Sequence, residues 1–272
     1  MSDDFEDLKK YFNFDIYADI YDQTRNISSS FSSLFSLIMK KAQIPAHSRP
    51  LLLELGAGTG IVVELLSKSK KISPQYVGID ISKKMLQKIK EKYDTTQVNL
   101  ILADAYTLPF KDHVFDLTLL IRTIHLLSNW KTALWELRRC LRKNQLLIIV
   151  TGGPGLKIIN QCYSNDEYIK LREKYGAPLF YYGADWQNVP KFIEHELNGT
   201  IEQLEGSHKV VKKLKDILIE FRNQLMTWHK QIDKPAHDKI VAELEECLLQ
   251  HYGSLDVDEE QNGFFTVAFV RF

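Results

Sequence analysis

The feature that most constrains this chain is a short apolar run that leads directly into three closely spaced glycines. The run Leu51-Leu-Leu-Glu-Leu55 is followed by Gly-Ala-Gly-Thr-Gly60, and a helical apolar pattern begins at Ile61. Glycine has no Cβ, so such a turn lets the backbone approach a bound molecule closely. Exposed N–H groups at the start of the next helix favour an electron-rich ligand group. Strand, turn and helix in this order predict the first unit of an open α/β sheet.

The chain from Leu51 to Thr151 alternates apolar runs with amphipathic stretches. Short apolar runs between turn residues are typical of buried strands, and apolar spacings of three and four are typical of helices. Ser82 is expected to cap one helix, because its hydroxyl can accept from an unpaired amide. This alternation predicts a parallel sheet with helices on both faces. We predict strands over 51–55, 76–79, 99–102, 115–121 and 146–150, and helices over 61–68, 82–93 and 128–141.

Outside this segment the pattern is less regular. Beyond Gly153 the chain is helical and rich in aromatic residues, and Ser164 with Glu167 fits a capping box at the start of a helix. Residues 264–272 are apolar and β-rich, which predicts a last strand that is antiparallel to its neighbours. The other expected elements are helices over 27–42, 210–228 and 237–250, and a short strand over 199–204.

These elements divide the chain into four predicted parts. Residues 1–46 form an N-terminal helical segment and 47–154 the core of strands and helices. Residues 155–198 form an aromatic helical cap, and 199–272 supply the sixth strand, two helices and closing strand of the core sheet. Ligands of open parallel sheets bind in the crevice beyond the carboxyl ends of the strands. The cap is therefore expected to lie over that crevice as a lid.

Two acidic residues follow strands in the same segment as the glycines. Asp80 ends the second predicted strand, about twenty residues past the glycine turn, where a carboxylate can accept hydrogen bonds from both hydroxyls of a ribose. Asp104 ends the third predicted strand, where a carboxylate can accept from the exocyclic amine of a purine. The set of a glycine turn and two carboxylates at three strand ends predicts a nucleoside-binding crevice.

Together these motifs resemble the class I S-adenosylmethionine-dependent methyltransferases. They are most similar to the small-molecule enzymes of the ubiquinone and menaquinone biosynthesis type, which carry a methyltransferase type 11 domain. The resemblance is specific over 17–155 and looser beyond, and it implies a Rossmann-like α/β sheet, mostly parallel with an antiparallel last strand, plus a helical cap. The matching motifs are Glu54-Leu-Gly-Ala-Gly-Thr-Gly60, Gly78-Ile-Asp80-Ile-Ser82, Ala103-Asp104-Ala105 with Leu108-Pro109-Phe110, Phe115-Asp116 through Leu127, and Tyr21-Asp22-Gln-Thr-Arg25.

This resemblance implies that S-adenosylmethionine is the cofactor and S-adenosylhomocysteine the product. The glycine turn would hold the methionine part against the backbone, with Glu54 supporting its amino end. Asp80 would hold the ribose, Asp104 the adenine amine, and the N-terminal segment would close over the cofactor. The implied cofactor-binding residues are Tyr17, Tyr21, Arg25, Glu54, Gly56, Ala57, Gly58, Thr59, Gly60, Asp80, Ile81, Met85, Asp104, Ala105, Ile121 and Arg122.

Methyl transfer needs mainly position and desolvation from the protein, because the cofactor carries its own activation. A general base is needed only for a protonated acceptor, and His125, near the crevice, is the candidate catalytic residue. Aromatic residues of the cap offer a large contact area for an apolar or planar acceptor. The predicted acceptor pocket is formed by Tyr163, Tyr181, Tyr182 and Trp186.

The composition argues against several classes of partner. The formal net charge is zero, so neither nucleic acid nor a membrane surface is expected as the main partner, and the acceptor is expected to be a small molecule. The three cysteines, Cys140, Cys162 and Cys247, are not spaced as metal ligands or a redox pair, and no metal site is expected. The acidic N-terminus does not resemble a secretory signal, so a cytoplasmic protein is expected. Its expected oligomeric state is a monomer or a homodimer.

Three alternatives stay open. A nicotinamide dehydrogenase would need a third glycine where Ile61 stands, and it gives Asp104 no role. A non-catalytic protein on the same fold, which binds S-adenosylmethionine or acts as a scaffold, has no reason to keep every cofactor motif. A protein or RNA methyltransferase fits the neutral charge less well than a small-molecule enzyme does. The absence of an Asp/Asn-Pro-Pro-Tyr/Phe motif and of a Pro-Cys pair argues against methylation of DNA bases.

Overall fold

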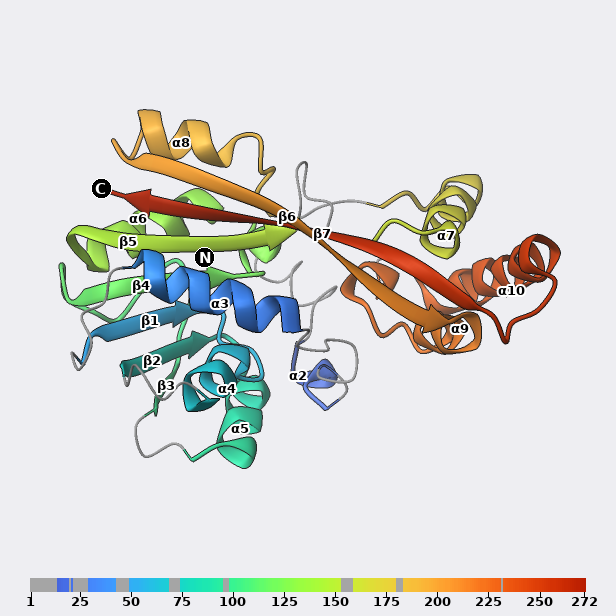
Figure 1. The fold of residues 1–272 in the computed structure, drawn as a ribbon, viewed down its shortest axis with the longest axis horizontal. Coiled ribbons are helices and arrows are strands. Elements are labelled where there is room, and N and C mark those ends of the chain that lie inside the picture. Colours follow the sequence, from blue (N-terminus) through green and yellow to red (C-terminus); the bar gives the residue numbers. More distant parts are fainter. Residues whose placement is uncertain are drawn as a thin grey trace.

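The backbone of the protein is built on one seven-stranded sheet with the strand order β3-β2-β1-β4-β5-β7-β6 (Figure 1). This architecture comes from a computed structural model, which describes residues 14–19, 21, 29–42, 49–68, 74–94, 98–152, 159–179, 183–230 and 232–272. The strands are β1 (Leu51–Leu55), β2 (Gln75–Asp80), β3 (Val98–Leu102), β4 (Phe115–Ile121), β5 (Leu141–Gly152), β6 (Thr200–Lys213) and β7 (Asp258–Arg271).

The pairing of the strands confirms the predicted sheet. Strands β1 to β5 pair in parallel, and β7 lies antiparallel to both β5 and β6. The glycine turn, Asp80 and Asp104 therefore come together at one edge, because the carboxyl ends of parallel strands point the same way. All five strands predicted between 51 and 151 are present, and β5 is longer than expected because it starts at Leu141.

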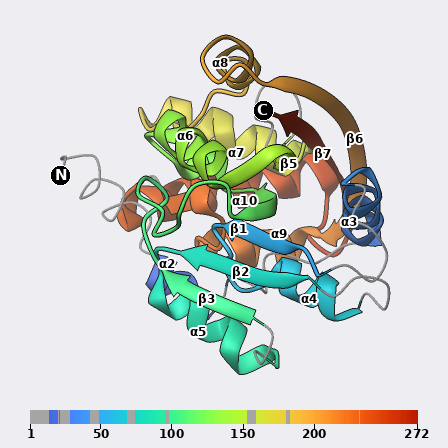
Figure 2. The ribbon, with the colours of Figure 1, turned by 90° about the vertical axis from the view of Figure 1, so that its left-hand side faces the viewer.

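Helices cover both faces of the sheet (Figure 2). One face packs against α3 (Ser29–Lys41), α4 (Ile61–Lys68) and α5 (Lys83–Lys92). The predicted cap of α5 is confirmed, since the Ser82 hydroxyl accepts from the N–H of Met85 at 3.2 Å. The remaining helices are α2 (Phe14–Tyr17), α6 (Trp130–Cys140), α7 (Tyr163–Lys174), α8 (Val189–His195), α9 (Leu214–Arg222) and α10 (Lys234–Tyr252), with 3₁₀ turns η2 (Ile124–Leu126) and η3 (Thr227–Lys230).

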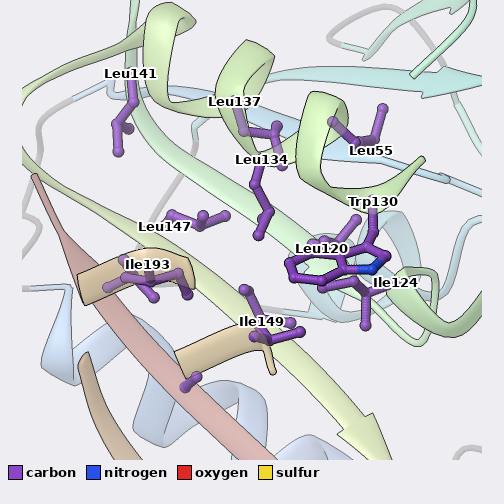
Figure 3. Packing of buried hydrophobic residues seen from close by; sticks show 14 of the residues in the cluster. Leu55, Leu120, Ile124, Trp130, Leu134, Leu137, Leu141, Leu147, Ile149 and Ile193 are labelled. Carbon is purple, nitrogen blue, oxygen red and sulfur yellow. The ribbon is translucent and has the colours of Figure 1, made fainter. Parts of the chain in front are cut away.

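The opposite face packs against α6 and α8 (Figure 3). Leu134 and Leu137 of α6, with Ile193 of α8, lie over Leu147 and Ile149 of β5, and all five are fully buried. Each buried aliphatic side chain of this kind stabilises the fold by roughly 1.5–3 kcal/mol relative to an exposed one. This double-sided core fixes the strand ends from which the site is built.

Strands β6 and β7 continue past the sheet as a two-stranded ribbon that ends in a helical lobe (Figure 1). We call α7, α9 and α10 the helical lobe. Its own core is formed by fully or nearly fully buried side chains such as Phe221, Leu244 and Tyr168. The Tyr168 hydroxyl and His237 Nδ1 lie 2.8 Å apart, and His237 Nε2 lies 2.7 Å from the Phe221 carbonyl oxygen. The lobe is therefore a packed unit in which the buried polar groups of Tyr168 and His237 have partners.

The prediction of a single long helix over 210–228 is wrong. Residues up to Lys213 belong to β6, and the helix begins only at Leu214. The apolar residues that suggested one helical face, including Val210, also fit the two-residue period of a strand. The ladder with β7, which pairs every residue from 200 to 213, decides in favour of the strand because it satisfies the backbone of the whole segment.

The structure also groups the predicted cap differently from the expectation for 155–198. Helix α7 joins α9 and α10 in the helical lobe, whereas α8 packs on the core sheet through Val189, Phe192 and Ile193. The predicted capping box at Ser164 is not formed by Glu167. Instead, the N–H and hydroxyl of Ser164 donate to Glu259 of β7 at 2.9 and 2.6 Å. A distant strand therefore caps this helix.

Candidate active site

A cavity of about 310 Å³ lies at the carboxyl ends of β1, β2, β3 and β4, with α2 at its margin. All four strands run parallel, so their carboxyl ends lie at the same edge of the sheet and face the same space. The cavity combines apolar walls with the glycine turn and two carboxylates. Its lining residues are Phe14, Asp15, Tyr21, Leu55, Gly56, Gly58, Ile79, Asp80, Ile81, Ser82, Met85, Ala103, Asp104, Ala105, Tyr106, Ile121, Arg122, Thr123, Leu126 and Leu127.

The glycine turn is held in place by backbone hydrogen bonds to the neighbouring strand. The N–H groups of Gly56 and Ala57 both donate to the Ile79 carbonyl oxygen at 2.8 Å. Gly56 has a φ of +79° and lies against Thr123, so that a Cβ at this position would stand 2.4 Å from Thr123 Oγ1. Only glycine fits both the backbone conformation and the available space. The turn therefore presents bare backbone to the cavity.

Asp80 is bound to the turn and to the start of α5. Its Oδ2 accepts from the Gly58 N–H and its Oδ1 accepts from the Ser82 N–H, both at 2.8 Å. Burial raises the pKa of Asp80, while the hydrogen bonds from Ser82 and Gly58 oppose that change. Each ionised oxygen can accept more than one hydrogen bond, so the carboxylate keeps acceptor capacity toward the cavity.

Asp104 begins a tight turn after β3. Its Oδ1 accepts from the Tyr106 N–H at 2.9 Å, which orients the carboxylate beside the Ala105 backbone. The Tyr106 hydroxyl in turn lies 3.3 Å from Ser128 Oγ and accepts from the Asn129 N–H at 3.2 Å. This wall of the cavity is thus tied to the segment ahead of α6.

Glu54 lies beneath the turn rather than in the cavity wall. It is 1% exposed and accepts a hydrogen bond from the Tyr76 hydroxyl of β2. Burial raises the pKa of Glu54 to about 8; the Tyr76 hydrogen bond opposes the rise and the Asp80 charge adds to it. Glu54 is therefore largely protonated near neutral pH, with its charge removed from the floor of the site.

Ten of the sixteen implied cofactor residues line the cavity. Ala57, Thr59 and Gly60 belong to the same turn but are not among the residues that line the cavity, and Ala57 and Thr59 are buried. The Tyr17 backbone ends α2, its side chain lies outside the described part, and Arg25 lies entirely outside the described residues. The ten cavity-lining residues are Tyr21, Gly56, Gly58, Asp80, Ile81, Met85, Asp104, Ala105, Ile121 and Arg122.

Two of the four predicted acceptor residues, Tyr163 and Trp186, are not among the residues that line this cavity. Tyr163 stacks on His251 in the helical lobe, with ring centroids 3.8 Å apart. Trp186 is 5% exposed in the core under α8 and donates to Gln203 Oε1 at 3.0 Å. Tyr181 and Tyr182 lie outside the described residues. Both of these aromatic residues therefore pack against a core, Tyr163 in the helical lobe and Trp186 beside the sheet.

His125 lies in η2 and is 7% exposed, next to the cavity-lining residues Leu126 and Leu127 but not among them. The segment at Gly183 lies directly against its backbone, since a Cβ on Gly183 would stand 2.3 Å from the His125 carbonyl carbon. His208 of β6 was not singled out by the sequence. Burial and the positive charge of Arg122 lower its pKa.

Sequence reasoning also missed several residues that line the cavity. Asp15 of α2 accepts from the Ser82 hydroxyl and from the Lys84 N–H, at 3.2 Å for the latter. Thr123, which donates to the Ile121 carbonyl oxygen at 2.9 Å, closes the other side of the glycine turn. Asp15 belongs to no motif, and Thr123 lies inside the matched segment that runs from Phe115 to Leu127 without being singled out, so only the fold reveals their place in the cavity. No group of three or more His, Cys, Asp or Glu side chains within the described ranges is placed to hold a metal.

Parts of this chain are similar in sequence to known methyltransferases. Residues 53–149 match the family model for a methyltransferase domain. The demethylmenaquinone methyltransferase of Staphylococcus saprophyticus is 28% identical over 175 residues, which cover 59% of this chain and 72% of that protein. The demethylmenaquinone methyltransferase of Staphylococcus aureus is 31% identical over 130 residues, which cover 47% of this chain and 52% of that protein.

Solved structures share the fold at low sequence identity. Phosphoethanolamine N-methyltransferase 2 of Haemonchus contortus, in complex with S-adenosyl-L-methionine, has a TM-score of 0.56 and 20% identity, covering all of this chain and 60% of that one. The [4+2]-cyclase SpnF has a TM-score of 0.51 and 16% identity, covering 90% of this chain and 83% of that one. The fold is thus shared by proteins with different named reactions, and the site must carry the functional argument. Within the described ranges, no helix is both long and apolar enough to cross a bilayer.

Proposed function

Because this chain is a class I S-adenosylmethionine-dependent methyltransferase, we propose that it transfers the methyl group to a small-molecule acceptor. The observation that carries the proposal is the cavity, in which the glycine turn, Asp80 and Asp104 meet apolar walls. A pocket of about 310 Å³ is of the size that encloses small molecules. The formal net charge of zero also favours a small acceptor over a nucleic acid.

The residues of the cavity fit the cofactor, S-adenosylmethionine. Asp80 retains acceptor capacity for two neighbouring ribose hydroxyls, since each ionised oxygen can accept more than one hydrogen bond. Asp104 offers an acceptor for the adenine amine, between the apolar side chains of Ile81 and Met85 and the backbone of Ala105. Gly58 lines the cavity, and a Cβ at this position would meet no atom nearer than 4.0 Å, so the bare backbone here leaves space for the methionine part of the cofactor.

When bound, S-adenosylmethionine supplies a methyl group made electrophilic by a positively charged sulfur. The chain's own contribution is position and exclusion of water. Ile121 at the end of β4 and Leu126 and Leu127 after it give that side of the cavity apolar surface beside Arg122 and Thr123. Thr123 is fixed by its bond to Ile121, so this wall is rigid where it meets the glycine turn. Such a wall favours an acceptor that presents a neutral or aromatic surface.

Relatives named for demethylmenaquinone suggest the first acceptors to test, which are small reduced quinones and related phenols. The nucleophile, whether oxygen, nitrogen or carbon, is then read from the methylated product. If the acceptor must lose a proton, His125 stays our proposed base, because it lies beside two residues of the cavity wall. A cytoplasmic location is part of the same proposal, and it is supported by the three free cysteines.

The test is a calorimetric titration with S-adenosylhomocysteine, with NAD as the control ligand. We expect binding of the first and not of the second. A mass-spectrometric screen of small acceptors with S-adenosylmethionine then follows, with proteins and RNA as the comparison substrates. Methylation confined to protein or RNA would overturn the small-molecule proposal. Binding of S-adenosylhomocysteine without transfer to any acceptor would favour the non-catalytic alternative.

A His125→Asn variant tests the proposed base separately. A base role predicts that kcat falls by roughly 10²–10⁴-fold while the affinity for S-adenosylhomocysteine is unchanged. It also predicts that the acidic limb of the pH–rate profile disappears. A kcat close to that of the wild type would remove His125 from the mechanism. His208, whose pKa is lowered by burial and by the charge of Arg122, would then be the next candidate base.

A further inference from the structure

The outer edge of β6 is the longest unpaired backbone surface in the described part of the sheet. All fourteen residues from Thr200 to Lys213 pair with β7 on one side. In the strand order β6 is terminal, and Figure 2 shows it along the outer margin of the molecule with no described strand beyond it. The other terminal strand, β3, has only five residues. Exposed edges of this length normally carry features that control further pairing.

The charges of β6 are sorted along the strand. The first half carries Glu202 and Glu205, and the second half carries Lys209, Lys212 and Lys213. All of these except Lys213 are placed symmetrically about Ser207, two and five residues away on each side. In parallel, in-register pairing of two such strands each lysine would meet a lysine, which is destabilising. In antiparallel pairing centred on Ser207, each acid instead meets a base.

Side-chain orientation agrees with this symmetry. From Leu204 onward the even-numbered residues of β6 are half-buried, and the odd-numbered ones, including Glu205, Ser207 and Lys209, are exposed. Antiparallel pairing about Ser207 joins residues of the same parity, so Glu205 and Lys209 of two strands meet on the exposed face. On the opposite face Leu204 would meet Val210, which is an apolar contact. Both faces are therefore self-complementary.

The ion pairs that β6 already makes leave Glu205 available to pair with a second copy of the strand. Lys209 already lies 2.7 Å from Glu260 of β7, and Lys212 lies 2.5 Å from Glu220 of α9. Glu205 is exposed and makes no ion pair within the part of the chain that the structure describes. A second strand would place Lys209 between Glu260 and the Glu205 of the other copy. The result is a cross-strand ladder of alternating charge.

We propose that β6 is a homodimer interface, in which two copies of this chain pair their β6 edges antiparallel about a twofold axis at Ser207. A twofold interface of this kind is closed, because each copy uses the same patch and offers no second one. The two sheets become one continuous sheet across the axis. This interface lies outside the cofactor cavity, so the proposal goes beyond the proposed function and does not depend on the identity of the acceptor.

The experiment measures the dissociation constant of the full chain by sedimentation velocity over a concentration series. Three variants are compared with the wild type: Glu205→Lys, the charge swap Glu205→Lys with Lys209→Glu and Glu260→Lys, which also keeps the existing pair between positions 209 and 260, and the control Glu173→Lys on the exposed side of α7. We expect a wild-type dimer. Glu205→Lys creates two like-charge contacts per dimer and should weaken it by about tenfold or more. The charge swap should restore dimerisation, and Glu173→Lys should leave it unchanged.

Circular dichroism and thermal melting of each variant confirm that the monomer is folded. Amide hydrogen exchange gives a second readout, since dimerisation should slow exchange of outward-pointing β6 amides in the wild type and not in Glu205→Lys. A wild-type protein that stays monomeric throughout the series would overturn the proposal. So would a dimer indifferent to Glu205→Lys, or one that the charge swap fails to restore.

Discussion

The backbone N–H of Gly58 donates a hydrogen bond of 2.8 Å to Oδ2 of Asp80, which joins the glycine turn after β1 to the carboxylate at the end of β2. The two features that the sequence presents as separate motifs are therefore one structural unit. Because a second backbone N–H, from Ser82, holds the other oxygen, the carboxylate has a fixed orientation toward the cavity. Changes at either end of this unit should be felt at the other.

Replacing the Asp80 carboxylate tests whether the linked glycine turn and carboxylate bind the cofactor. Asp80→Asn keeps the size of the side chain but removes its charge and one acceptor oxygen. We expect S-adenosylhomocysteine to bind about tenfold to a hundredfold more weakly, because charge-assisted hydrogen bonds to the ribose and to Gly58 are lost. Calorimetry measures the change, and Asp216→Asn on the exposed face of α9 is the matched control. Wild-type affinity in Asp80→Asn would show that this carboxylate does not bind the cofactor.

The buried carboxyl of Glu54 should make stability depend on pH. Its pKa is raised from 4.5 to about 8 on folding, so between these values the folded state binds more protons than the unfolded state. The stabilisation from this group is fully present below the pKa of the unfolded state, 4.5, and is lost as pH rises through the pKa of the folded state, about 8. The free energy of unfolding should fall by up to about 1.4 kcal/mol per pH unit in this window from this group. Urea unfolding of Glu54→Gln should show a flatter profile there, whereas an equal slope would contradict the assignment.

Gly56 is needed because its φ is positive and because Thr123 occupies the space of a Cβ, and a matched pair of variants can separate these two reasons. Gly56 and Gly176 both have positive φ, +79° and +69°, but only at Gly56 would a Cβ meet Thr123. We expect Gly176→Ala to cost about 1 kcal/mol of stability and Gly56→Ala about 2–4 kcal/mol, because of the added clash. Denaturant melts measure both. Equal costs would mean that Thr123 moves away freely, and Gly56→Ala with Thr123→Ala should recover part of the difference.

Glu259 should hold the helical lobe to the ribbon. It is 3% exposed and accepts from the Ser164 N–H and hydroxyl and, at 3.1 Å, from the Tyr252 hydroxyl. Glu259→Ala would leave these groups without their acceptor and should destabilise the lobe by about 2–4 kcal/mol. Hydrogen exchange should rise in α7 and α10 and stay unchanged in β1 and β4. An equal rise in both regions would indicate that lobe and core unfold as one unit.

The core of the fold could be predicted from local patterns because each of its elements is encoded within itself. The run 51–55, the glycine turn and the cap at Ser82 are each decided by neighbours in the chain, and the structure confirms them. The cavity-lining role of Asp80 and Asp104 followed from strand ends alone, since parallel strands bring their carboxyl ends together. By contrast, Asp15 and Thr123 reach the cavity from segments whose positions depend on the assembled sheet.

The parallel sheet, its glycine turn and its two carboxylates are encoded in local patterns, because short apolar strands and amphipathic helices can be recognised from neighbouring residues alone. The conformation of 200–213 depends on the assembled fold, because its apolar residues suit both a strand and a helix. Its fourteen-residue pairing with β7 satisfies the backbone and makes it a strand. The same pairing carries α7, α9 and α10 away from the core, so Tyr163 packs in a separate lobe, while Trp186 is buried under α8. Long-range pairing of this kind leaves no local signal, since it depends on a partner that lies more than forty residues away in the chain.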